Sequence, residues 1–563
     1  MLGDEFDESL EESAVGNDIG SREWLIALLI AVAAAAVLSL PYLLGYLLAQ
    51  HGTVYTGVIM NPEDTQSYFA KMLQGYDGQW LYSIPFTPEK HVPAFLGGFY
   101  LLLGHFAHWL GLSLEGIWHL SRFLIDIFLF MVTFGFIKAF LDDRTTRWLA
   151  FTIAIFGSGL GWLLFLLQQP NWLGAFPVDF KMPEAHLFFT ALTFPHVALG
   201  TALILISFWL LWEVSRQHPR SWLLSFCAGL SNLTLGIVYP FLIYLVVLTT
   251  ALYWFYLIYR HRRLDWLLSS KFGITLLIPA PLYVYYVYVH QVNEVFRSWS
   301  NQAVLPSPPW PHYLIAYGLL LLLAILPIAA KITSDKDRAR TSLLWIWIVS
   351  AAILIFLPLN AQRRFVQGLH IPLSILAAGG IVQVVLPKIS ESRLYGKALA
   401  HPRYNKAGLN RLILTTVVLF LSLSNLYLLA DVSLTAALRQ PYPFFRFESE
   451  MKAVEWLRDN TDQSAIVMAS YETGNLVAAR AGNRVFIGHW AETVNWKDKY
   501  DQVSLFFDNA ADDEWRESLI DEFGIDYVWY GRKEREIGDF NPEKSLYLIP
   551  AYAHDDVVIF KVS

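Results

Sequence analysis

The sequence predicts a polytopic α-helical membrane protein with a soluble α/β domain at its C-terminal end, and three observations support this fold class. The 563-residue chain is 55% hydrophobic and 16% charged, whereas soluble domains average about 45–50% apolar and about 25% charged residues. Its apolar residues fall in long runs such as 24–48 and 237–259, and a run of about 18 or more can span a bilayer. The 21 Trp residues and the 15% aromatic content are typical of many membrane–water boundaries.

About eleven segments are apolar enough to be transmembrane helices, and they place a membrane domain at residues 23–435. The expected spans are 24–48, 117–140, 148–168, 196–215, 221–237, 239–259, 270–289, 312–330, 342–358, 367–386 and 412–432. Cytoplasmic loops carry an excess of Lys and Arg, and these spans put the basic loops on one side. The basic residues are Arg144, Arg147, Arg216, Arg220, Arg260, Arg262, Arg263, Lys331, Lys336, Arg338, Arg340, Lys388, Arg393, Lys397, Arg403, Lys406 and Arg411.

This alternation requires that residues 91–112 do not span the membrane. That segment is then expected along the outer leaflet, within a long first external loop of residues 49–116 that holds membrane-surface helices. Residues 1–22 are acidic and have no basic stretch before the first apolar run. We therefore expect a disordered cytoplasmic tail rather than a cleaved signal peptide. The expected location is the plasma (inner) membrane, with residues 440–563 extracytoplasmic.

The C-terminal 120 or so residues have the pattern of a small soluble domain. Short apolar runs such as AIVMAS, RVFIGH, DYVWYG and VVIFKVS read as strands, and EMKAVEWLRDN, GNLVAARAG and EWRESLIDEFG between them read as helices. Strands that alternate with helices predict a mainly parallel α/β sheet.

Several classes of site are excluded by composition. The single cysteine, Cys227, excludes an intrachain disulfide and a CxxC metal or redox site. The glycine-rich stretch 157–161 lies within an apolar run, where small residues let helices approach closely, and it has no nucleotide-binding fingerprint. No nucleic-acid partner is expected.

The first external loop contains adjacent carboxylates, Glu63 and Asp64, directly after Pro62. A proline followed by acids is a helix-start signal, because the acids interact favourably with the helix dipole in the first turn. An ordinary helix cap is one interpretation of this pair. The other is a general base at the membrane surface.

A second external loop, residues 169–195, leads through Glu184 and His186 to His196. These three residue types can bind a metal, although the spacing matches no familiar zinc pattern. The alternatives are hydrogen bonds to a polar substrate or simple loop caps. A divalent metal is thus a candidate cofactor, and no other cofactor is expected.

Arg363 and Arg364 break the charge rule, because they lie at the external end of a span. Paired guanidinium groups there can hold a phosphate or pyrophosphate, or can snorkel to lipid headgroups. The proline-rich loop 301–312 is stiff, and it suits a lid or groove wall as well as a plain connector.

These features together resemble the GT-C superfamily of membrane glycosyltransferases, in particular the protein mannosyltransferase and aminoarabinose transferase branch. The resemblance covers the layout of residues 24–220: the Glu63–Asp64 pair, the segment from His91, the span that begins Ser121-Arg122-Phe123, and Glu184. The appended outer domain also fits. The stretches PEAHLFF, QRRFVQGLHIPL and SYETGNLVAARAGNRVFIGH resemble those of bacterial membrane proteins grouped with that superfamily.

The resemblance implies transfer of a sugar from a polyprenyl-phosphate-linked donor to a glycan, lipid or protein acceptor at the outer face of the membrane. It implies that Asp64 is the catalytic base, with Glu63 beside it, and that Glu184 orients the donor or acceptor. Arg122, Arg363 and Arg364 would lie near the lipid phosphate, and His186 and His196 would contact substrate. The chain departs from the family pattern at Glu184, where many relatives have Asp, and at His91-Val92-Pro93, which lacks the usual double proline.

Two other functions fit the sequence. A transport or lipid-handling protein would place its ionisable residues at mid-bilayer and show inverted repeats, whereas here only Asp126 lies at that depth. A membrane scaffold would act through its outer domain. The scaffold is favoured if Asp64→Asn and Arg364→Ala leave transfer intact while deletion of 440–563 abolishes function.

Overall fold

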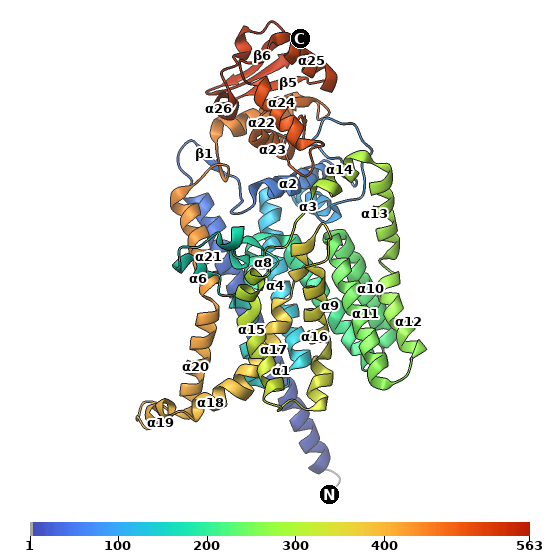
Figure 1. Cartoon of the computed structure of the whole chain (residues 1–563), viewed down its shortest axis with the longest axis vertical. Helices are drawn as coiled ribbons and strands as arrows, with labels where there is room; N and C mark the ends of the chain where they lie inside the picture. The colour runs from blue at the N-terminus through green and yellow to red at the C-terminus, as the bar shows by residue number, and fades with distance from the viewer. Residues whose placement is uncertain (1–3) are drawn as a thin grey trace.

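The computed structural model describes residues 4–563, with side chains from residue 21 onward. The predicted acidic tail, residues 1–22, falls almost entirely outside the residues with described side chains, so its disorder stays a prediction. A long helical bundle stands beneath a small domain that contains the C-terminus, and the N-terminal end of the first helix projects from the opposite end (Figure 1). The domain and the bundle are thus stacked along the long axis.

Seven helical segments in the described part of the chain are long and apolar enough to cross a membrane, and two bent pairs raise the number to nine. They comprise α1 (Asp4–Leu47), α4 (Leu114–Phe140), α9 (Pro195–Ser215), α10 (Ser221–Val238), η2 with α11 (Pro240–Leu242, Ile243–His261), α15 (Pro311–Ala329), and the run of η3, α17, η4 and α18 (Gln362–Val366, His370–Gly380, Ile381–Val385, Leu386–Ser390). Helix α16 (Asp335–Leu354) packs against α11 and α17 in the same bundle. The polytopic helical prediction is confirmed.

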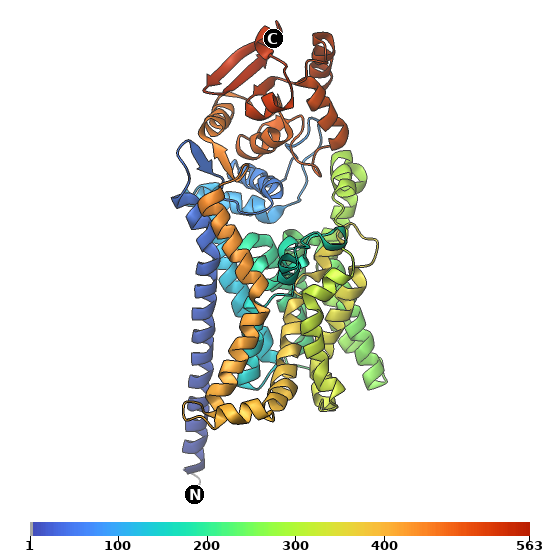
Figure 2. The same ribbon diagram turned by 60° about the vertical axis from the view of Figure 1, so that its left-hand side comes forward.

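Both bent pairs occupy predicted single spans. Helices α12 (Trp266–Leu277) and α13 (Ala280–Val292) meet at 41° around Pro279, which lacks the amide hydrogen that a continuous helix needs. Helix α20 (Lys406–Leu421) meets α21 (Leu423–Leu434) and η5 (Thr435–Arg439) at 53°. Figure 2 shows α1 extending along the bundle beside this second pair.

The predicted continuous span at 148–168 is wrong. Helix α5 (Arg144–Phe156) has only 13 residues, about 20 Å at 1.5 Å per residue, and hydrocarbon needs about 30 Å. The chain then becomes extended at Gly157 and resumes in the short α6 (Trp162–Leu166). Neighbouring helices satisfy the released backbone, because Ser158 N donates to Leu421 O at 2.6 Å and Leu160 N to Ile315 O at 2.9 Å. Irregular backbone at this depth is tolerated when it is buried in protein in this way.

The long loop after α1 contains two short helices that lie across the end of the bundle (Figure 1). Helices α2 (Pro62–Tyr76) and α3 (Gly98–Leu110) pack on each other. Their backbones approach closely, because a Cβ on Gly75 would lie 2.0 Å from Leu101 O and one on Gly104 would lie 1.9 Å from Met72 O. With 13 residues, α3 is too short to span, as the charge pattern predicts for residues 91–112.

The second external loop and the segment before α15 are built from short helices and turns. They contain η1 (Trp172–Gly174), α7 (Val178–Lys181), α8 (Leu187–Thr193) and α14 (Glu294–Gln302). Helix α19 (Arg393–Leu399) joins α18 to α20 at the opposite end of the bundle (Figure 1).

The C-terminal domain is an α/β fold around a five-stranded sheet in the order β4-β3-β5-β7-β6. Its elements are α22 (Glu448–Asn460), β3 (Ile466–Met468), α23 (Tyr471–Arg480), β4 (Arg484–Val485), α24 (Trp496–Phe506), α25 (Asp513–Phe523), β5 (Tyr527–Tyr530), α26 (Arg532–Ile537), η6 (Pro542–Lys544), β6 (Leu548–His554) and β7 (Val557–Val562). Strand β3 pairs parallel with β4 and β5, whereas β7 pairs antiparallel with β5 and β6. The sheet is therefore mixed rather than mainly parallel, because the chain ends in a β6–β7 hairpin.

A second, two-stranded sheet ties this domain to the loop after α1. Strand β1 (Thr53–Tyr55) pairs antiparallel with β2 (Phe445–Phe447) in the register Thr53↔Phe447. Basic residues of two predicted cytoplasmic loops lie at the other end of the bundle. There Arg147 pairs with Glu23 near the start of the α1 span, and Arg340 Nη2 lies 2.8 Å from Asp142 Oδ1. The loops that contain Arg147 and Arg340 therefore share one end of the bundle.

Candidate functional site

The first turn of α2 faces a cavity of about 1500 Å³ between the soluble domain and the bundle. The helix begins as predicted, with Asn61 in the left-handed region at φ 45°, Pro62 in the first turn, and Glu63 and Asp64 after it. Both carboxylates line the cavity. The pair therefore both starts a helix and faces a cavity.

The cavity has a polar end and an apolar end. Its polar end takes residues from α2, from η3 and from the soluble domain, and its apolar end extends between α11, α12, α13 and α16. The apolar walls include Val247, Leu248, Ala251, Leu276, Val287 and Ile353. A ligand with a charged head and a long hydrocarbon tail fits this division, because each part meets surroundings of its own polarity.

Asp64 has a hydrogen-bonding partner from the soluble domain. His489 Nε2 lies 3.3 Å from Asp64 Oδ1, and the Asp64 side chain keeps 40% exposure whereas His489 keeps 5%. Burial raises the pKa of Asp64, but the His489 contact and the charges of Arg364 and Arg363 outweigh it and lower that pKa below its ordinary value. Asp64 is thus a carboxylate at neutral pH and can accept a proton.

Glu63 is held differently from its neighbour. Its Oε2 accepts a hydrogen bond from the hydroxyl of Tyr471 at 3.1 Å, in the first turn of α23. The same hydroxyl accepts from the backbone N of Trp490 at 3.1 Å. Glu63 is therefore tied to the soluble domain, and Asp64 is the more available base.

Arg363 and Arg364 both line the cavity from the short helix η3. Their Nε atoms are buried and have no hydrogen-bond partner among the described residues. The Arg364 guanidinium lies 5.3 Å from the Tyr239 ring centre and 5.0 Å from that of Phe241, so aromatic faces stabilise the cation. Buried donors without partners are costly, so these guanidinium groups are suited to hold an anion.

Glu184 supports this arginine. Its Oε1 accepts from the Tyr239 hydroxyl at 3.1 Å and lies 3.9 Å from Arg364 Nε. Glu184 itself is 6% exposed and is not among the residues that line the cavity. The geometry places Glu184 behind Arg364, where it can orient the guanidinium.

The proposed metal set of Glu184, His186 and His196 does not converge. His196 lines the cavity, with its Nδ1 2.6 Å from the Tyr100 hydroxyl, whereas His186 packs against the rings of His370 and Tyr317 away from it. Among the residues that the structure describes, no three His, Cys, Asp or Glu side chains are grouped to hold a metal ion. Glu184, His186 and His196 therefore do not share one site.

Arg122 lies outside the cavity. It is buried between α1 and α4, where its guanidinium lies 3.7 Å from Asp126, donates to Ser39 Oγ at 3.0 Å and sits over the Tyr42 ring. A buried cation already paired within its own helix has no access to a lipid phosphate in this cavity. The structure thus separates Arg122 and His186 from the other expected substrate contacts.

The proline-rich loop 301–312 contributes a wall. Ala303 and Leu305 line the cavity, and backbone hydrogen bonds join Leu305 to Asn360 and to Arg363. This loop therefore fixes the position of η3 and is more than a connector.

Several cavity residues come from the soluble-domain loop 488–493 and were not anticipated from the sequence. His489, Trp490 and Glu492 line the cavity, as does Lys71 of α2. Glu492 Oε1 lies 2.9 Å from Lys71 Nζ and also bonds Ser67 Oγ, while its Oε2 lies 2.5 Å from the Tyr82 hydroxyl. This buried network joins the loop to α2.

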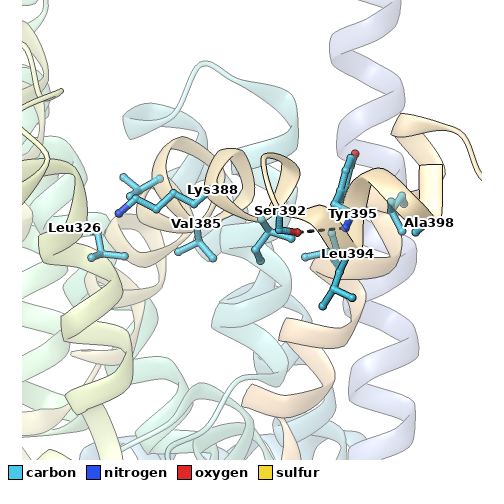
Figure 3. A pocket seen from close by; sticks show the side chains of 11 residues that line it. Leu326, Val385, Lys388, Ser392, Leu394, Tyr395 and Ala398 are labelled. Atoms are coloured by element: carbon cyan, nitrogen blue, oxygen red, sulfur yellow. Dashed lines mark hydrogen bonds between the residues drawn. The ribbon is translucent and has the colours of Figure 1, made fainter. Parts of the chain in front are cut away.

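A second hollow, of about 640 Å³, lies at the opposite end of the bundle. Figure 3 shows its lining, with Leu326, Val385 and Lys388 on one side and Leu394 and Tyr395 on the other, and with Ser392 Oγ accepting from Tyr395 N at 3.2 Å. Lys388 is its one charged lining residue. The hollow lacks a carboxylate and holds no candidate base.

No protein-family model matches this chain, and no curated protein matches its sequence. The Archaeoglobus fulgidus oligosaccharyltransferase in its apo form matches in structure at 12% identity and TM-score 0.52, over 90% of this chain and 69% of that chain. ArnT from Cupriavidus metallidurans bound to undecaprenyl phosphate matches at 11% identity and TM-score 0.48, over 95% and 97% of the two chains. The arabinofuranosyltransferase AftD from Mycobacteria matches at 13% and 0.48, over 94% and 41%.

Of these three, the oligosaccharyltransferase alone has a TM-score above 0.5, and at such low identity the similarity concerns the fold. It extends through both the bundle and the soluble domain, since it covers nine-tenths of this chain. The chain therefore shares the overall fold of this archaeal oligosaccharyltransferase.

Proposed function

We propose that this protein transfers a sugar from a polyprenyl-phosphate-linked donor to an acceptor hydroxyl. One observation carries the proposal: a single cavity joins the carboxylate of Asp64, the guanidinium groups of Arg363 and Arg364, and an apolar groove between membrane helices. The fold shared with an oligosaccharyltransferase supports the same class of reaction.

In the proposed reaction, the donor phosphate binds to Arg363 and Arg364 while its lipid tail occupies the apolar groove. Asp64 takes the proton of the acceptor hydroxyl as that oxygen bonds to the anomeric carbon of the sugar. The bond from that carbon to the phosphate oxygen breaks, and polyprenyl phosphate leaves with its negative charge stabilised by the two arginines. Because phosphate is a good leaving group in this setting, the site needs no general acid.

The remaining polar residues have supporting roles in this proposal. Glu184 is a positioning residue, because it contacts Arg364 and Tyr239 and does not line the cavity. His196 and Glu63 line the polar end, where they can contact hydroxyl groups of the sugar or the acceptor.

Binding of undecaprenyl phosphate should depend on Arg364. The variant Arg364→Ala is expected to raise the Kd for this lipid by about 10–100-fold, since hydrogen bonds to a charged group are worth about 1.5–3 kcal/mol. Native mass spectrometry of the purified protein with undecaprenyl phosphate measures the change. The matched control is Arg439→Ala, an arginine with 67% side-chain exposure that pairs with Asp431 outside the cavity. An unchanged Kd in the double variant Arg363→Ala, Arg364→Ala would remove the phosphate site from the proposal.

The cavity is proposed to open toward the extracytoplasmic side, in agreement with the charge pattern of the loops. In a Cys227→Ser background, a cysteine at Leu546, which is 98% exposed in the soluble domain, should react with a membrane-impermeant maleimide in intact cells. A cysteine at Asp335, whose side chain is 97% exposed at the other end of the bundle, should react only after permeabilisation. The reverse pattern would place the site in the cytoplasm and rule out an external acceptor.

A further inference from the structure

The contact between Asp64 and His489 crosses from the membrane domain to the soluble domain, and both ring nitrogens of His489 are engaged. Nε2 lies 3.3 Å from Asp64 Oδ1. Nδ1 accepts hydrogen bonds from the backbone N–H groups of Ala491 and Glu492, each at 3.3 Å. Because two N–H donors point at Nδ1, this atom must present its lone pair, so the ring proton lies on Nε2.

This arrangement fixes what His489 can do. With its proton on Nε2, the neutral ring donates to Asp64 Oδ1 and leaves the second carboxylate oxygen of Asp64 for the acceptor. A proton on Nδ1 would oppose the two backbone donors, so the ring presents its Nε2–H to Asp64. His489 therefore acts as a fixed donor to the carboxylate.

The loop that holds His489 is itself immobilised from several sides. Thr493 Oγ1 accepts from the backbone N of His489 at 3.3 Å and donates to Phe86 O at 2.7 Å. Gln302 of α14 donates to Ala491 O at 3.2 Å and to Thr493 O at 2.8 Å. The buried Glu492, in the same loop, forms an ion pair with Lys71 of α2. Such support is what a preorganised catalytic group requires.

We propose that His489 is a positioning residue for Asp64, so that the soluble domain completes the catalytic base of the membrane domain. The inference rests on the proposed function for its catalytic meaning, but the effect of His489 on Asp64 can be measured without any substrate. Removal of the donor should leave the Asp64 carboxylate less stabilised and less well oriented.

The charged and titratable groups around this contact come from several elements. They are Glu63, Tyr68 and Lys71 of α2, His196 of α9, Arg363 and Arg364 of η3, and Tyr471 and Glu492 of the soluble domain. A His489 variant substitutes none of these residues, so a shift in the titration of Asp64 reports the loss of the His489 donor.

The experiment follows carbodiimide labelling of Asp64 as a function of pH, because this reagent reacts with the protonated carboxyl. Full-length protein is labelled in lipid nanodiscs, and mass spectrometry of the peptide that contains Asp64 gives the midpoint. In His489→Leu the midpoint should move up by about one pH unit, the size expected when a hydrogen bond to a charged group is removed. His489→Gln, which keeps an N–H donor, should move it less. His554→Leu is the matched control, because His554 also neighbours an aspartate, Asp555, in the same domain but outside the cavity.

An unchanged midpoint in His489→Leu overturns the inference. Thermal unfolding accompanies each measurement, and if the Leu variant is unstable then His489→Phe, which keeps a ring in place, is judged by the same criterion. If the midpoint moves but Asp64→Asn retains full sugar transfer, the positioning role stands while the proposed function fails. If Asp64→Asn is inactive and the midpoint is fixed, the proposed function stands and His489 has only a structural role.

Discussion

Asp64→Asn is expected to lower sugar transfer by about 10²–10⁴-fold, the range that a general base contributes. Asparagine has nearly the same shape and can still meet His489, but it cannot take a proton from the acceptor hydroxyl. The measurement is release of undecaprenyl phosphate from a panel of undecaprenyl-phosphate-linked pentoses and hexoses by purified protein in nanodiscs. Binding of undecaprenyl phosphate by the same variant should change little, because the arginines that hold the phosphate are intact.

Two further variants make this result specific. Asp77→Asn changes an aspartate just beyond the C-terminus of the same helix, where it contacts Gln463 and Arg458 outside the cavity, and should leave transfer unchanged. Glu63→Gln should lose less activity than Asp64→Asn, because Glu63 is already bonded to Tyr471. Full activity in Asp64→Asn would exclude Asp64 as the base.

The pH profile of transfer provides an independent check on Asp64. Its pKa is lowered in the folded protein, and the base must be deprotonated to act. Activity should therefore persist as pH falls through the ordinary range of an aspartate and should decline only at lower pH. An acid limb near neutrality would point to a different base.

The positions of the main cavity residues were accessible from the sequence because each belonged to a recognisable local pattern. Arg363 and Arg364 were basic at the wrong end of a span, and the carboxylates of Glu63 and Asp64 followed a proline at a helix start. The sequence left open whether the arginines contact lipid headgroups and whether the acids only cap the helix. The structure places all four around one cavity.

Arg122, which the family resemblance placed near the lipid phosphate, is instead buried in contacts between α1 and α4. Its partner, Asp126, is four residues farther along the same helix, a spacing that brings two side chains together on one helix face. This spacing is visible in the sequence, but the family resemblance, through the motif Ser121-Arg122-Phe123, implied a lipid phosphate as the partner of Arg122. The ion pair with Arg122, at 3.7 Å, accounts for the presence of Asp126 at membrane depth.

His489 and Glu492 were beyond reach for a different reason. Their partners on α2 are 425 and 421 positions away in the chain, and no local pattern encodes a contact of that range. Glu184 and His186 show that closeness in the sequence does not predict a shared site either. They are two residues apart in irregular backbone, and their side chains reach different partners, the first Arg364 and Tyr239, the second His370.

The pair of Lys71 and Glu492 is expected to dominate the attachment of the soluble domain. Their side chains are 4% and 2% exposed, and their nitrogen and oxygen atoms lie 2.9 Å apart. Lys71→Met leaves a buried carboxylate without its cation, and breaking such a pair costs about 3–5 kcal/mol. Thermal unfolding and limited proteolysis between the two domains measure this loss. Lys452→Met, which breaks an exposed pair with Glu448, should change neither.

The double variant Lys71→Met, Glu492→Gln separates charge from shape. Because Glu492→Gln replaces the unpaired carboxylate with a neutral amide, the free energy of unfolding of the double variant should be higher than that of Lys71→Met alone. Burial raises the pKa of Glu492, but Lys71, His489 and the hydroxyls of Ser67 and Tyr82 together outweigh it and lower that pKa below its ordinary value. The pair therefore stabilises the fold above the unfolded pKa of Glu492 and weakens as pH falls through its folded pKa. Because His489 shares the loop with Glu492, the single variant should also release the donor from Asp64 and reduce transfer. A stable and fully active Lys71→Met protein would show that the loop is held by its other bonds, chiefly those of Gln302 and Thr493.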